Sequence, residues 1–405
     1  MSLETEIGII EIGDKNLKCV IFKLNNESPE ILSTSIVKSE GIINGTVINS
    51  KRASSSIRSC IGAAEEKATI LLKKINVVLE QPDFLSTTFS KQRKINGSKI
   101  QKEDIEFLLN EAKKELILND TNQSVVHIFN HNYIVDGKTF IEEPIEVYAN
   151  DLSHEITFIT IPKNNLKNIQ QVFYDCDIEV DRLISNTFAL AVQLINNNNL
   201  NIGSILINFD YEKTSIGVFK NLAFIHSSTF PVGFNHITKD LSKVCSLSLK
   251  DSLGIKKNIN FLFKDNHGLF DGDGYLKKNY FNESNYRKIS EGLILKIIKT
   301  RLDEILSIIK KRMLSSGLNI NSGIEIFLTG DGSHLSNIDK YFSIFFGTDI
   351  KKLDKNFNDY EQNFNSCFGA LKIIQEGWET EALPKKITKK SYKIGFFAKI
   401  FGLKE

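Results

Sequence analysis

The sequence predicts an α/β fold in which one structural unit occurs twice. Residues 7–24 alternate apolar and polar side chains on both sides of a turn at 13–16, a pattern typical of two strands joined by a tight turn. Residues 204–219 repeat this pattern about 195 residues later, with the turn at 209–213. Apolar residues at helical spacing follow each copy, so we expect the chain to consist of two structurally related halves.

The first half continues with alternating helices and strands. Apolar spacing predicts a helix over 50–73, a strand over 75–79, a helix over 163–174, a strand over 178–183 and a helix over 186–194. Residues 85–160 differ, because they are rich in Ser, Thr and Lys. They predict one helix from Gln101 to Leu116 and short strands at 125–135, 145–149 and 155–161, which we interpret as an inserted subdomain.

The second half has its own order of elements. Strands are predicted at 204–208, 214–219 and 224–230, then a helical region near 235–258 and loops to about 283. A long amphipathic helix over 289–314 is expected to end at Gly317. A buried strand at 324–328 then leads into the glycine-containing loop 329–333.

These patterns divide the chain into six parts. They are 1–84 with 161–200 as the first-half subdomain, 85–160 as the insertion, 201–235 with 315–378 as the second-half subdomain, 236–314 as a smaller second-half subdomain, 379–390 as a basic linker and 391–405 as an amphipathic helix.

The composition excludes several classes of protein. Of the 405 residues, 41% are apolar and 25% are charged, as in ordinary globular proteins. The net charge of +2 comes from a strongly basic C-terminal segment, so the remainder is slightly acidic and is not expected to bind nucleic acid. The five cysteines show no metal-ligand or redox spacing, and we expect a reducing cytosol.

The last fifteen residues, 391–405, predict attachment to a membrane surface. Wound as a helix, they gather apolar and aromatic side chains on slightly more than half of the circumference, with lysines in or near the same arc. The residues expected to contact lipid are Tyr392, Lys393, Phe396, Phe397, Lys399, Ile400, Phe401 and Leu403. The segment is too short to span a bilayer, which needs about 20 apolar residues, and it suits the interface with anionic lipid. The alternative is a helix that docks on its own domain.

The order of these segments resembles one family, the bacterial cell-division protein FtsA. The resemblance runs from about residue 6 to 378, and the C-terminal segment is similar to the membrane-targeting helix of that family. It implies an actin-like duplicated fold of the actin/hexokinase/Hsp70 ATPase type, with 85–160 as the FtsA-specific subdomain. In such proteins two glycine-cornered hairpins hold the phosphates of ATP, because backbone N–H groups can approach the oxygens there.

The resemblance implies a set of nucleotide-binding positions with ATP and Mg²⁺ as ligands. They are Glu11, Gly13, Lys15, Asn208, Thr214, Lys256, Gly330, Gly332 and Ser333. The family's Asp-Ile-Gly-Thr-Ser is Glu-Ile-Gly-Asp-Lys at 11–15, and its Asp-Ile-Gly-Gly-Gly-Thr is Asn-Phe-Asp-Tyr-Glu-Lys at 208–213. These departures predict a weakened or abolished hold on the triphosphate, because acidic side chains repel phosphate. We therefore expect at most a weak ATPase.

Three further features of the sequence have both a functional and a simpler explanation. Arg301 stands where the family has Ile-Glu-Pro-Arg at a helix start, which implies a basic helix end that receives the C-terminal tail of FtsZ; the alternative is an ordinary solvated arginine. His127 and His131 have the spacing of a helical metal pair, but they fall in a predicted strand, so we expect surface histidines. The sequence Asp-Gly-Asp-Gly at 271–274 lacks the later ligands of a calcium loop and predicts a turn. No metal site and no catalytic constellation is predicted.

The resemblance implies a scaffold that tethers FtsZ filaments to the cytoplasmic face of the inner membrane at the division septum. Self-association into filaments and contacts with other division proteins are expected with it. Two alternatives share the fold: a PilM-like assembly adaptor of a pilus or secretion system, and an ATP-dependent filament protein like MreB. The phenylalanine-rich C-terminal segment favours the first reading over a PilM-like adaptor, and the altered second hairpin disfavours an MreB-like ATPase.

Overall fold

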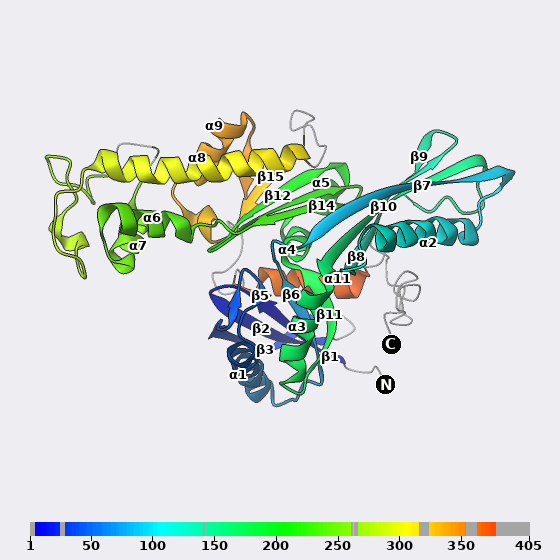
Figure 1. The fold of residues 1–405 in the computed structure, drawn as a ribbon, viewed down its shortest axis with the longest axis horizontal. Coiled ribbons are helices and arrows are strands. Elements are labelled where there is room, and N and C mark those ends of the chain that lie inside the picture. The colour runs from blue at the N-terminus through cyan, green and yellow to red at the C-terminus, as the bar shows by residue number, and fades with distance from the viewer. Residues whose placement is uncertain are drawn as a thin grey trace. The chain divides into compact units, whose positions relative to one another are not determined.

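Two five-stranded sheets with the same strand order carry the duplication that the sequence predicts (Figure 1). In this computed structural model the first sheet has the order β11-β6-β1-β2-β3, and the second has the order β14-β13-β12-β15-β16. Each sheet thus joins three consecutive strands to two strands that come later in its half of the chain. The predicted α/β class is confirmed.

The structure describes residues 5–24, 29–140, 142–260, 262, 266–315, 324–353 and 363–377. They divide into two compact units, which we describe one at a time. Unit 1 comprises Met1–Ile205, Gly217–Thr229 and Phe357–Glu405, and unit 2 comprises Leu206–Ile216 and Phe230–Asn356. The expected helix end at Gly317, the basic linker at 379–390 and the segment 391–405 lie outside the described residues. Within those residues, no helix is long and apolar enough to cross a membrane.

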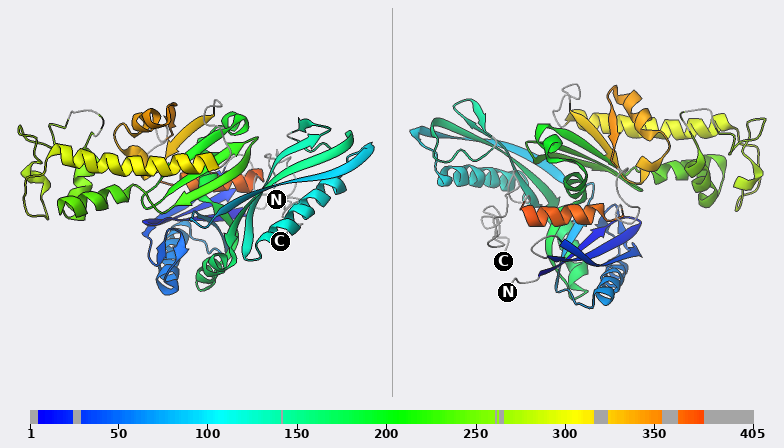
Figure 2. Two further views of the ribbon diagram at one scale, coloured as in Figure 1. Left: turned by 45° about the horizontal axis from the view of Figure 1, so that its top comes forward. Right: turned by 180° about the vertical axis from the view of Figure 1, so that it is seen from behind.

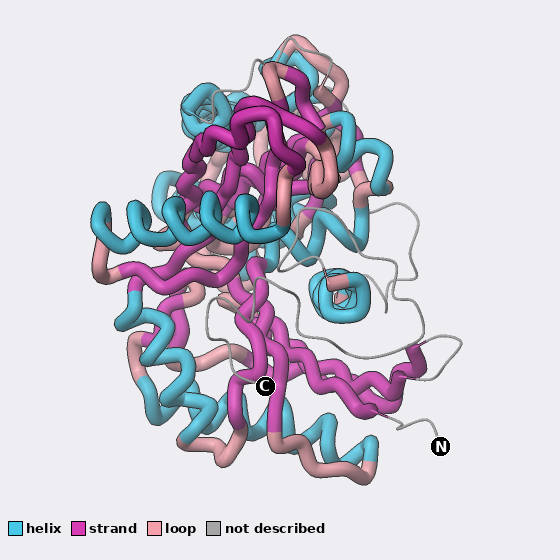
Figure 3. The backbone as a smooth tube through the Cα atoms, turned by 90° about the vertical axis from the view of Figure 1, so that its right-hand side faces the viewer, coloured by secondary structure: helices cyan, strands magenta, loops and turns pink. Residues whose placement is uncertain are grey.

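The first sheet combines an antiparallel meander with two parallel strands. Figure 3 draws the strands of the molecule in magenta and its helices in cyan. Its strands are β1 (Thr5–Ile12), β2 (Asn16–Leu24), β3 (Pro29–Lys38), β6 (Lys74–Leu79) and β11 (Glu179–Ser185). Ile9 and Ile10 are both fully buried. Because neighbouring residues of a strand point to opposite faces, both faces of this sheet are covered.

Helices of unit 1 provide that cover. They are α1 (Ser50–Ala68), α3 (Lys163–Tyr174), α4 (Asn186–Leu194) and α11 (Asn365–Glu376), and a further short helix, α5 (Asn197–Ile202), follows α4 in the chain. Helix α1 packs on β2 and β3 and contacts α3, whereas α4 and α11 pack on each other and on β6. A small ribbon, β4 (Ile42–Ile43) with β5 (Thr46–Val47), precedes α1.

Helix α1 is shorter than the sequence predicts. Asn49 caps its start by accepting a hydrogen bond from the backbone N–H of Arg52. It ends at Ala68, because Thr69 adopts a left-handed conformation (φ 57°) and its N–H returns to the carbonyls of Glu65 and Glu66. The predicted end at residue 73 is therefore wrong, and Leu71 lies beyond the helix with 84% of its surface exposed.

The inserted segment forms a sheet of its own with one helix on it (Figure 2). Its strand order is β7-β10-β8-β9, all antiparallel, with β7 (Leu85–Lys99), β8 (Gln123–Val135), β9 (Lys138–Phe140) and β10 (Tyr148–Pro162). Helix α2 (Lys102–Asn119) contacts β7 and β10. Its buried side chains Ile105, Leu108, Leu109, Ala112 and Leu116 fill the space between helix and sheet.

The second sheet and the helices after it complete the described chain. Its strands are β12 (Ser204–Phe209), β13 (Thr214–Lys220), β14 (Ala223–Phe230), β15 (Glu325–Thr329) and β16 (Ile350–Lys352). The helices are α6 (Asn235–Cys245), α7 (Leu249–Asn258), α8 (Glu291–Ser315) and α9 (Ile338–Phe346), with short 3₁₀ turns η1 (Lys278–Tyr280) and η2 (Asp331–His334). In unit 2, α6 contacts both α7 and α8.

Candidate functional site

The first hairpin places Glu11 at the end of β1, but its carboxylate is bound within unit 1. Oε2 of Glu11 lies 3.3 Å from Nζ of Lys18, and it accepts a 2.6 Å hydrogen bond from Oγ of Ser366 on α11. The side chain is only 12% exposed. Glu11 therefore joins β1, β2 and α11 within this unit.

The turn of the first hairpin is shaped by its own packing. The N–H of Gly13 donates to the carbonyl of Asn16, and a Cβ on Gly13 would lie 2.6 Å from that oxygen. The carboxylate of Asp14 accepts a 3.3 Å hydrogen bond from the N–H of Gly45, at the tip of the β4–β5 ribbon. Lys15 is exposed, and its carbonyl accepts from the N–H of Ser39. The glycine is thus required by the turn, and the aspartate anchors a neighbouring loop.

The second hairpin, in unit 2, buries its strand end. Asn208 is 2% exposed and Phe209 is fully buried, and the Phe209 ring packs edge-on against Phe234, with 5.8 Å between the centroids. The hydroxyl of Thr214 donates a 2.7 Å hydrogen bond to the carbonyl of Val232. Both Asn208 and Thr214 thus lie in the interior of the protein.

The glycine loop after β15 packs directly on Phe209. A Cβ on Gly330 would lie 2.4 Å from Oδ1 of Asn208, and a Cβ on Gly332 would lie 2.2 Å from the Phe209 ring. Gly330 also adopts a positive φ of 94°, which other residues rarely tolerate. Ser333 is fully buried in η2. Packing within unit 2 is therefore sufficient to require glycine at both positions.

Lys256 is a fully buried lysine on α7. Its ammonium group lies 3.5 Å from the centroid of the Phe234 ring and donates a 3.2 Å hydrogen bond to the Phe234 carbonyl. Glu11 and Lys256 are thus engaged by side chains and carbonyls of their own units, whereas Lys15 is exposed. No cluster of His, Cys, Asp or Glu able to bind a metal occurs among the described residues.

Arg301 lies within α8 and not at its start, so the expected basic helix end is not at this position. Its guanidinium forms two hydrogen bonds to the Asp240 carboxylate of α6, at 2.5 and 2.9 Å, and a third to Glu304 at 2.6 Å. The side chain is 22% exposed. The residue therefore ties α6 to α8 and is not an ordinary solvated arginine.

The two histidines of the inserted subdomain lie on a strand, as predicted, but they are not surface residues. His127 is 1% exposed and accepts a 3.0 Å hydrogen bond from the N–H of Ser185. Burial, together with the charge of Arg182, lowers its pKa to about 3. His131 has 15% of its side chain exposed and lies beside Glu155. The prediction of surface histidines is wrong, because the subdomain buries this part of β8.

The loop at 271–274 is a turn, as predicted. Oδ1 of Asp271 accepts hydrogen bonds from the N–H groups of Asp273 and Tyr275, the arrangement of an Asx turn. The five cysteines are all buried and free of disulfides.

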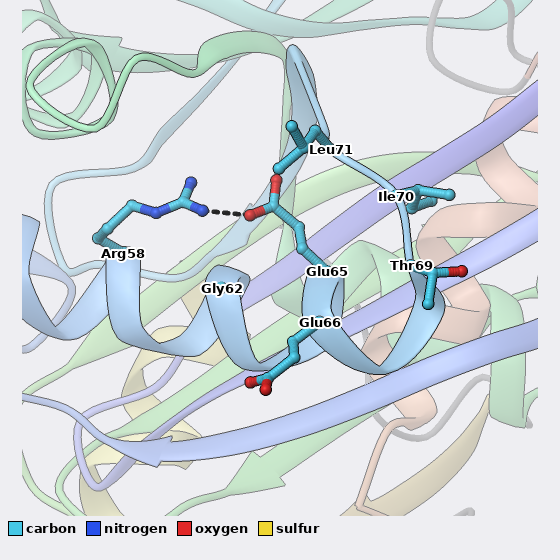
Figure 4. Close-up of a pocket in the computed structure, with 7 residues that line it drawn as sticks. All are labelled: Arg58, Gly62, Glu65, Glu66, Thr69, Ile70 and Leu71. Carbon is cyan, nitrogen blue, oxygen red and sulfur yellow. Dashed lines mark hydrogen bonds and ion pairs between the residues drawn. The ribbon is translucent and has the colours of Figure 1, made fainter.

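An open pocket that was not predicted from the sequence lies at the C-terminal end of α1 (Figure 4). Its volume is about 540 Å³, and it is lined by Arg58, Gly62, Glu65, Glu66, Thr69, Ile70 and Leu71. Arg58 and Glu65 form an ion pair in it, and Glu65 also accepts a 2.8 Å hydrogen bond from the N–H of Leu72. These bonds hold the loop after α1 in place.

Comparison with known proteins supplies the family context. Residues 84–160 match the family model described as the SHS2 domain inserted in FtsA. The match coincides with the subdomain formed by β7, α2, β8, β9 and β10.

Relatives and solved structures extend the similarity over most of the chain. The cell division protein FtsA of Agrobacterium fabrum is 20% identical over 343 residues, which cover 82% of this chain and 77% of the relative. FtsA of Bacillus subtilis is 24% identical over 311 residues, covering 76% and 70%.

Among solved structures, the PilM–PilN type IV pilus biogenesis complex matches with a TM-score of 0.60 and 12% identity, covering 90% of this chain and 97% of that chain. MreB5 of Spiroplasma citri bound to AMPPNP matches with a TM-score of 0.50 and 13% identity, covering 92% and 96%. At these identities the structures show the fold alone, which is actin-like. The chain therefore combines an actin-like fold, a match to the SHS2 domain inserted in FtsA, and sequence similarity to FtsA cell division proteins over most of its length.

Proposed function

We propose that the chain is a cell-division scaffold that tethers FtsZ filaments to the cytoplasmic face of the inner membrane at the septum. The observation that carries the proposal is the SHS2 domain of the kind inserted in FtsA, found within an actin-like chain. The FtsA relatives are named as cell division proteins, which supports the same role. Such a scaffold links the filament to the membrane mechanically, so it needs a membrane anchor and a surface that binds FtsZ.

Residues 391–405 are the proposed anchor. Burial of one large apolar side chain is worth roughly 1.5–3 kcal/mol, and each lysine near an anionic surface adds about 1 kcal/mol. Ordering the helix opposes this by about 1–2 kcal/mol per residue, so one segment binds weakly. An array of chains on one FtsZ filament binds firmly, because the second attachment is effectively intramolecular. Self-association would raise membrane affinity in the same way.

The surface formed by α6 and α8 is the proposed site for the FtsZ tail. Arg301 is 22% exposed and bound to Asp240 and Glu304, so its role is to hold α6 against α8 with part of its guanidinium accessible on this surface. The variant Arg301→Gln is expected to weaken binding of a peptide with the FtsZ tail sequence. Asp240→Asn is the matched control: it breaks the same ion pair but keeps the guanidinium, so peptide binding should persist. Equal losses in both variants would show that only the α6–α8 contact matters.

Sedimentation with liposomes tests the anchor. The full chain is compared with a variant that stops after Thr380, using vesicles that contain anionic lipid. We expect pelleting of the full chain only, with less pelleting at high salt because the lysine contribution is screened. Equal amounts of both proteins in the supernatant would show that 391–405 docks on protein instead of lipid.

A second candidate is an assembly adaptor related to PilM, because the PilM–PilN complex gives a TM-score of 0.60. Such an adaptor would bind a peptide from a membrane-protein partner in place of the FtsZ tail. Immobilised peptides of both kinds separate the two functions. Retention of the chain by the FtsZ tail alone supports the scaffold, and retention by a PilN peptide alone supports the adaptor.

A further inference from the structure

We propose that this chain folds and assembles without a nucleoside triphosphate, because its own side chains fill the roles that ATP and Mg²⁺ have in nucleotide-dependent relatives. Folding and assembly are thus proposed to be independent of nucleotide, and only the liposome assay rests on the proposed scaffold function. It is carried by contacts within each unit taken separately.

The turn of the second hairpin, residues 209–213, holds two acidic residues and one basic residue, Lys213. Asp210 and Glu212 lie in it, and Asp331 lies in the glycine loop of the same unit. Burial and the charges of Glu212 and Asp331 raise the pKa of Tyr211, so both carboxylates act on this turn. Burial opposes ionisation of Glu212, but hydrogen bonds from Lys239 and Asn235 outweigh it and lower its pKa. Glu212 is thus an anion at neutral pH, where a phosphate-binding turn would present positive charge.

The hydrogen-bond donors of this turn are used internally. The N–H of Asp210 donates to the carbonyl of Lys213 at 3.1 Å, and the N–H of Tyr211 donates to the Asp210 carboxylate at 2.7 Å. A phosphate nest needs consecutive N–H groups that converge on the anion. Two of the relevant N–H groups point to protein oxygens instead.

Four further bonds tie the turn to the start of α6. The carbonyls of Asp210 and Tyr211 accept from the N–H groups of Phe234 and Asn235, at 2.8 and 2.7 Å. The Glu212 carboxylate accepts from Nδ2 of Asn235 and from Nζ of Lys239, each at 2.7 Å. In addition, a Cβ on Gly233 would lie 2.4 Å from the nitrogen of Lys213, so the two segments are in direct contact. A bridging ligand is not needed to hold this turn in place.

Lys256 and Glu11, two further polar residues of the implied nucleotide site, also bind groups of the protein itself. The ammonium of Lys256 lies on the Phe234 ring and carbonyl, and in unit 1 the Glu11 carboxylate lies between Lys18 and Ser366. Binding MgATP through these groups would require breaking buried bonds before any new ones form. Glu11 and Lys256, two of the polar residues that the resemblance implies as ligands, therefore have structural roles.

Thermal unfolding of the full chain tests the proposal directly. Purified protein treated with apyrase and EDTA is titrated with MgATP and MgAMPPNP from about 0.1 to about 5 mM, since any ligand specific for the folded state raises Tm with its concentration. MreB5 of Spiroplasma citri, whose structure contains AMPPNP, is the positive control. We expect full folding after the treatment and no concentration-dependent shift in Tm. A rising Tm, or unfolding when nucleotide is removed, would overturn the proposal.

Liposome sedimentation with and without MgATP separates this proposal from the scaffold function. Membrane binding that depends on 391–405 but is unchanged by MgATP supports both. Binding that increases at least tenfold with MgATP overturns nucleotide independence and leaves the scaffold function standing. A chain that fails to bind the membrane, yet shows no Tm shift with nucleotide, contradicts the anchor and supports nucleotide independence.

Discussion

Two buried histidines make the inserted subdomain sensitive to acid. His127 and His154 are at most 1% exposed, and burial lowers the pKa of each from 6.5 to about 3. His154 stacks on Tyr133, with 4.2 Å between ring centroids, and its Nε2 donates to Oδ1 of Asn130. Between pH 6.5 and 3 the unfolded chain binds protons that the folded chain refuses, so the free energy of unfolding falls as the pH falls through this window.

We predict that His154→Gln flattens this pH dependence. Each buried histidine lowers the free energy of unfolding by up to about 1.4 kcal/mol per pH unit below 6.5. Between pH 7 and pH 5 the free energy of unfolding of the variant should therefore fall by roughly 2 kcal/mol less than that of the parent. Glutamine keeps an N–H donor for Asn130. Urea unfolding at several pH values measures the slope, and a variant of an exposed histidine, His267→Gln, is measured beside it as the matched control. Parallel curves for parent and His154→Gln would contradict the account.

Gly332 gives a second prediction at the scale of one residue. Gly332→Ala places a methyl group 2.2 Å from the fully buried Phe209 ring, so we expect a loss of about 1–3 kcal/mol of stability. Adding Phe209→Leu to that variant should recover part of the loss, because it makes room. Gly254→Ala on α7 is the control, since nothing lies within 4 Å of its added carbon. Chemical unfolding without nucleotide measures all of these variants, and a neutral Gly332→Ala would disprove the packing role.

The glycines also show what a sequence can and cannot reveal at this scale. Glycine at 330 and 332 indicates that something approaches the backbone closely, and the sequence is right to that extent. It cannot tell a ligand from a side chain of the same protein. In the structure the approaching groups are Asn208 and Phe209, which precede the glycines by more than a hundred positions in the chain.

At the scale of elements, the ion pair between Arg301 and Asp240 joins two helices. The side chains of Arg301 and Asp240 are 22% and 27% exposed. An ion pair this exposed contributes little to stability if it has a single hydrogen bond. The two parallel hydrogen bonds of this pair place its contribution toward the upper end of the range usual for surface ion pairs. A double-mutant cycle with Arg301→Gln and Asp240→Asn should give a coupling energy of about 1 kcal/mol that falls with added salt. The exposed pair Lys250–Glu283 is the comparison, with coupling near zero. Equal coupling in both pairs would refute the proposed difference.

The C-terminal segment offers a prediction that separates apolar burial from charge. On a helical wheel Phe401 falls in the apolar arc, and Ala398 falls on the opposite, narrow side. Phe401→Glu and Ala398→Glu change the net charge equally. We expect Phe401→Glu to reduce liposome binding at least tenfold and Ala398→Glu to reduce it only slightly, as read from sedimentation isotherms. Similar losses in both variants would mean that charge alone governs binding.

Helices and strands with a strong periodicity of apolar residues were predictable from the sequence, whereas strands rich in polar residues were not. The meander of β1 and β2, the helices α4 and α8, and the strand β15 follow from apolar spacing, because one face or both are buried. Strand β7 was missed, since it is an edge strand whose exposed Thr88, Ser90, Gln92 and Lys94 resemble a loop. Strand β10 was predicted as two strands, but its pairing with β7 and β8 continues across a bulge.

For the whole molecule, the order of the elements along the chain was more informative about the fold than any single motif. The two sheets share one order although their turns differ in sequence, and the FtsA similarity persists at 20–25% identity over most of the chain. Burial of apolar strands determines this order, whereas the turns can change without loss of the fold. The nucleotide positions stay a prediction from the resemblance, and the bonds that engage Glu11 and Lys256 come from other segments of the chain and needed the structure.

Co-sedimentation tests whether the chain links FtsZ to a membrane. FtsZ of the same organism is mixed with anionic liposomes and either the full chain or the variant that stops after Thr380. We expect FtsZ to pellet with liposomes only when the full chain is present. FtsZ that remains in the supernatant, while the full chain itself pellets, would contradict the tether.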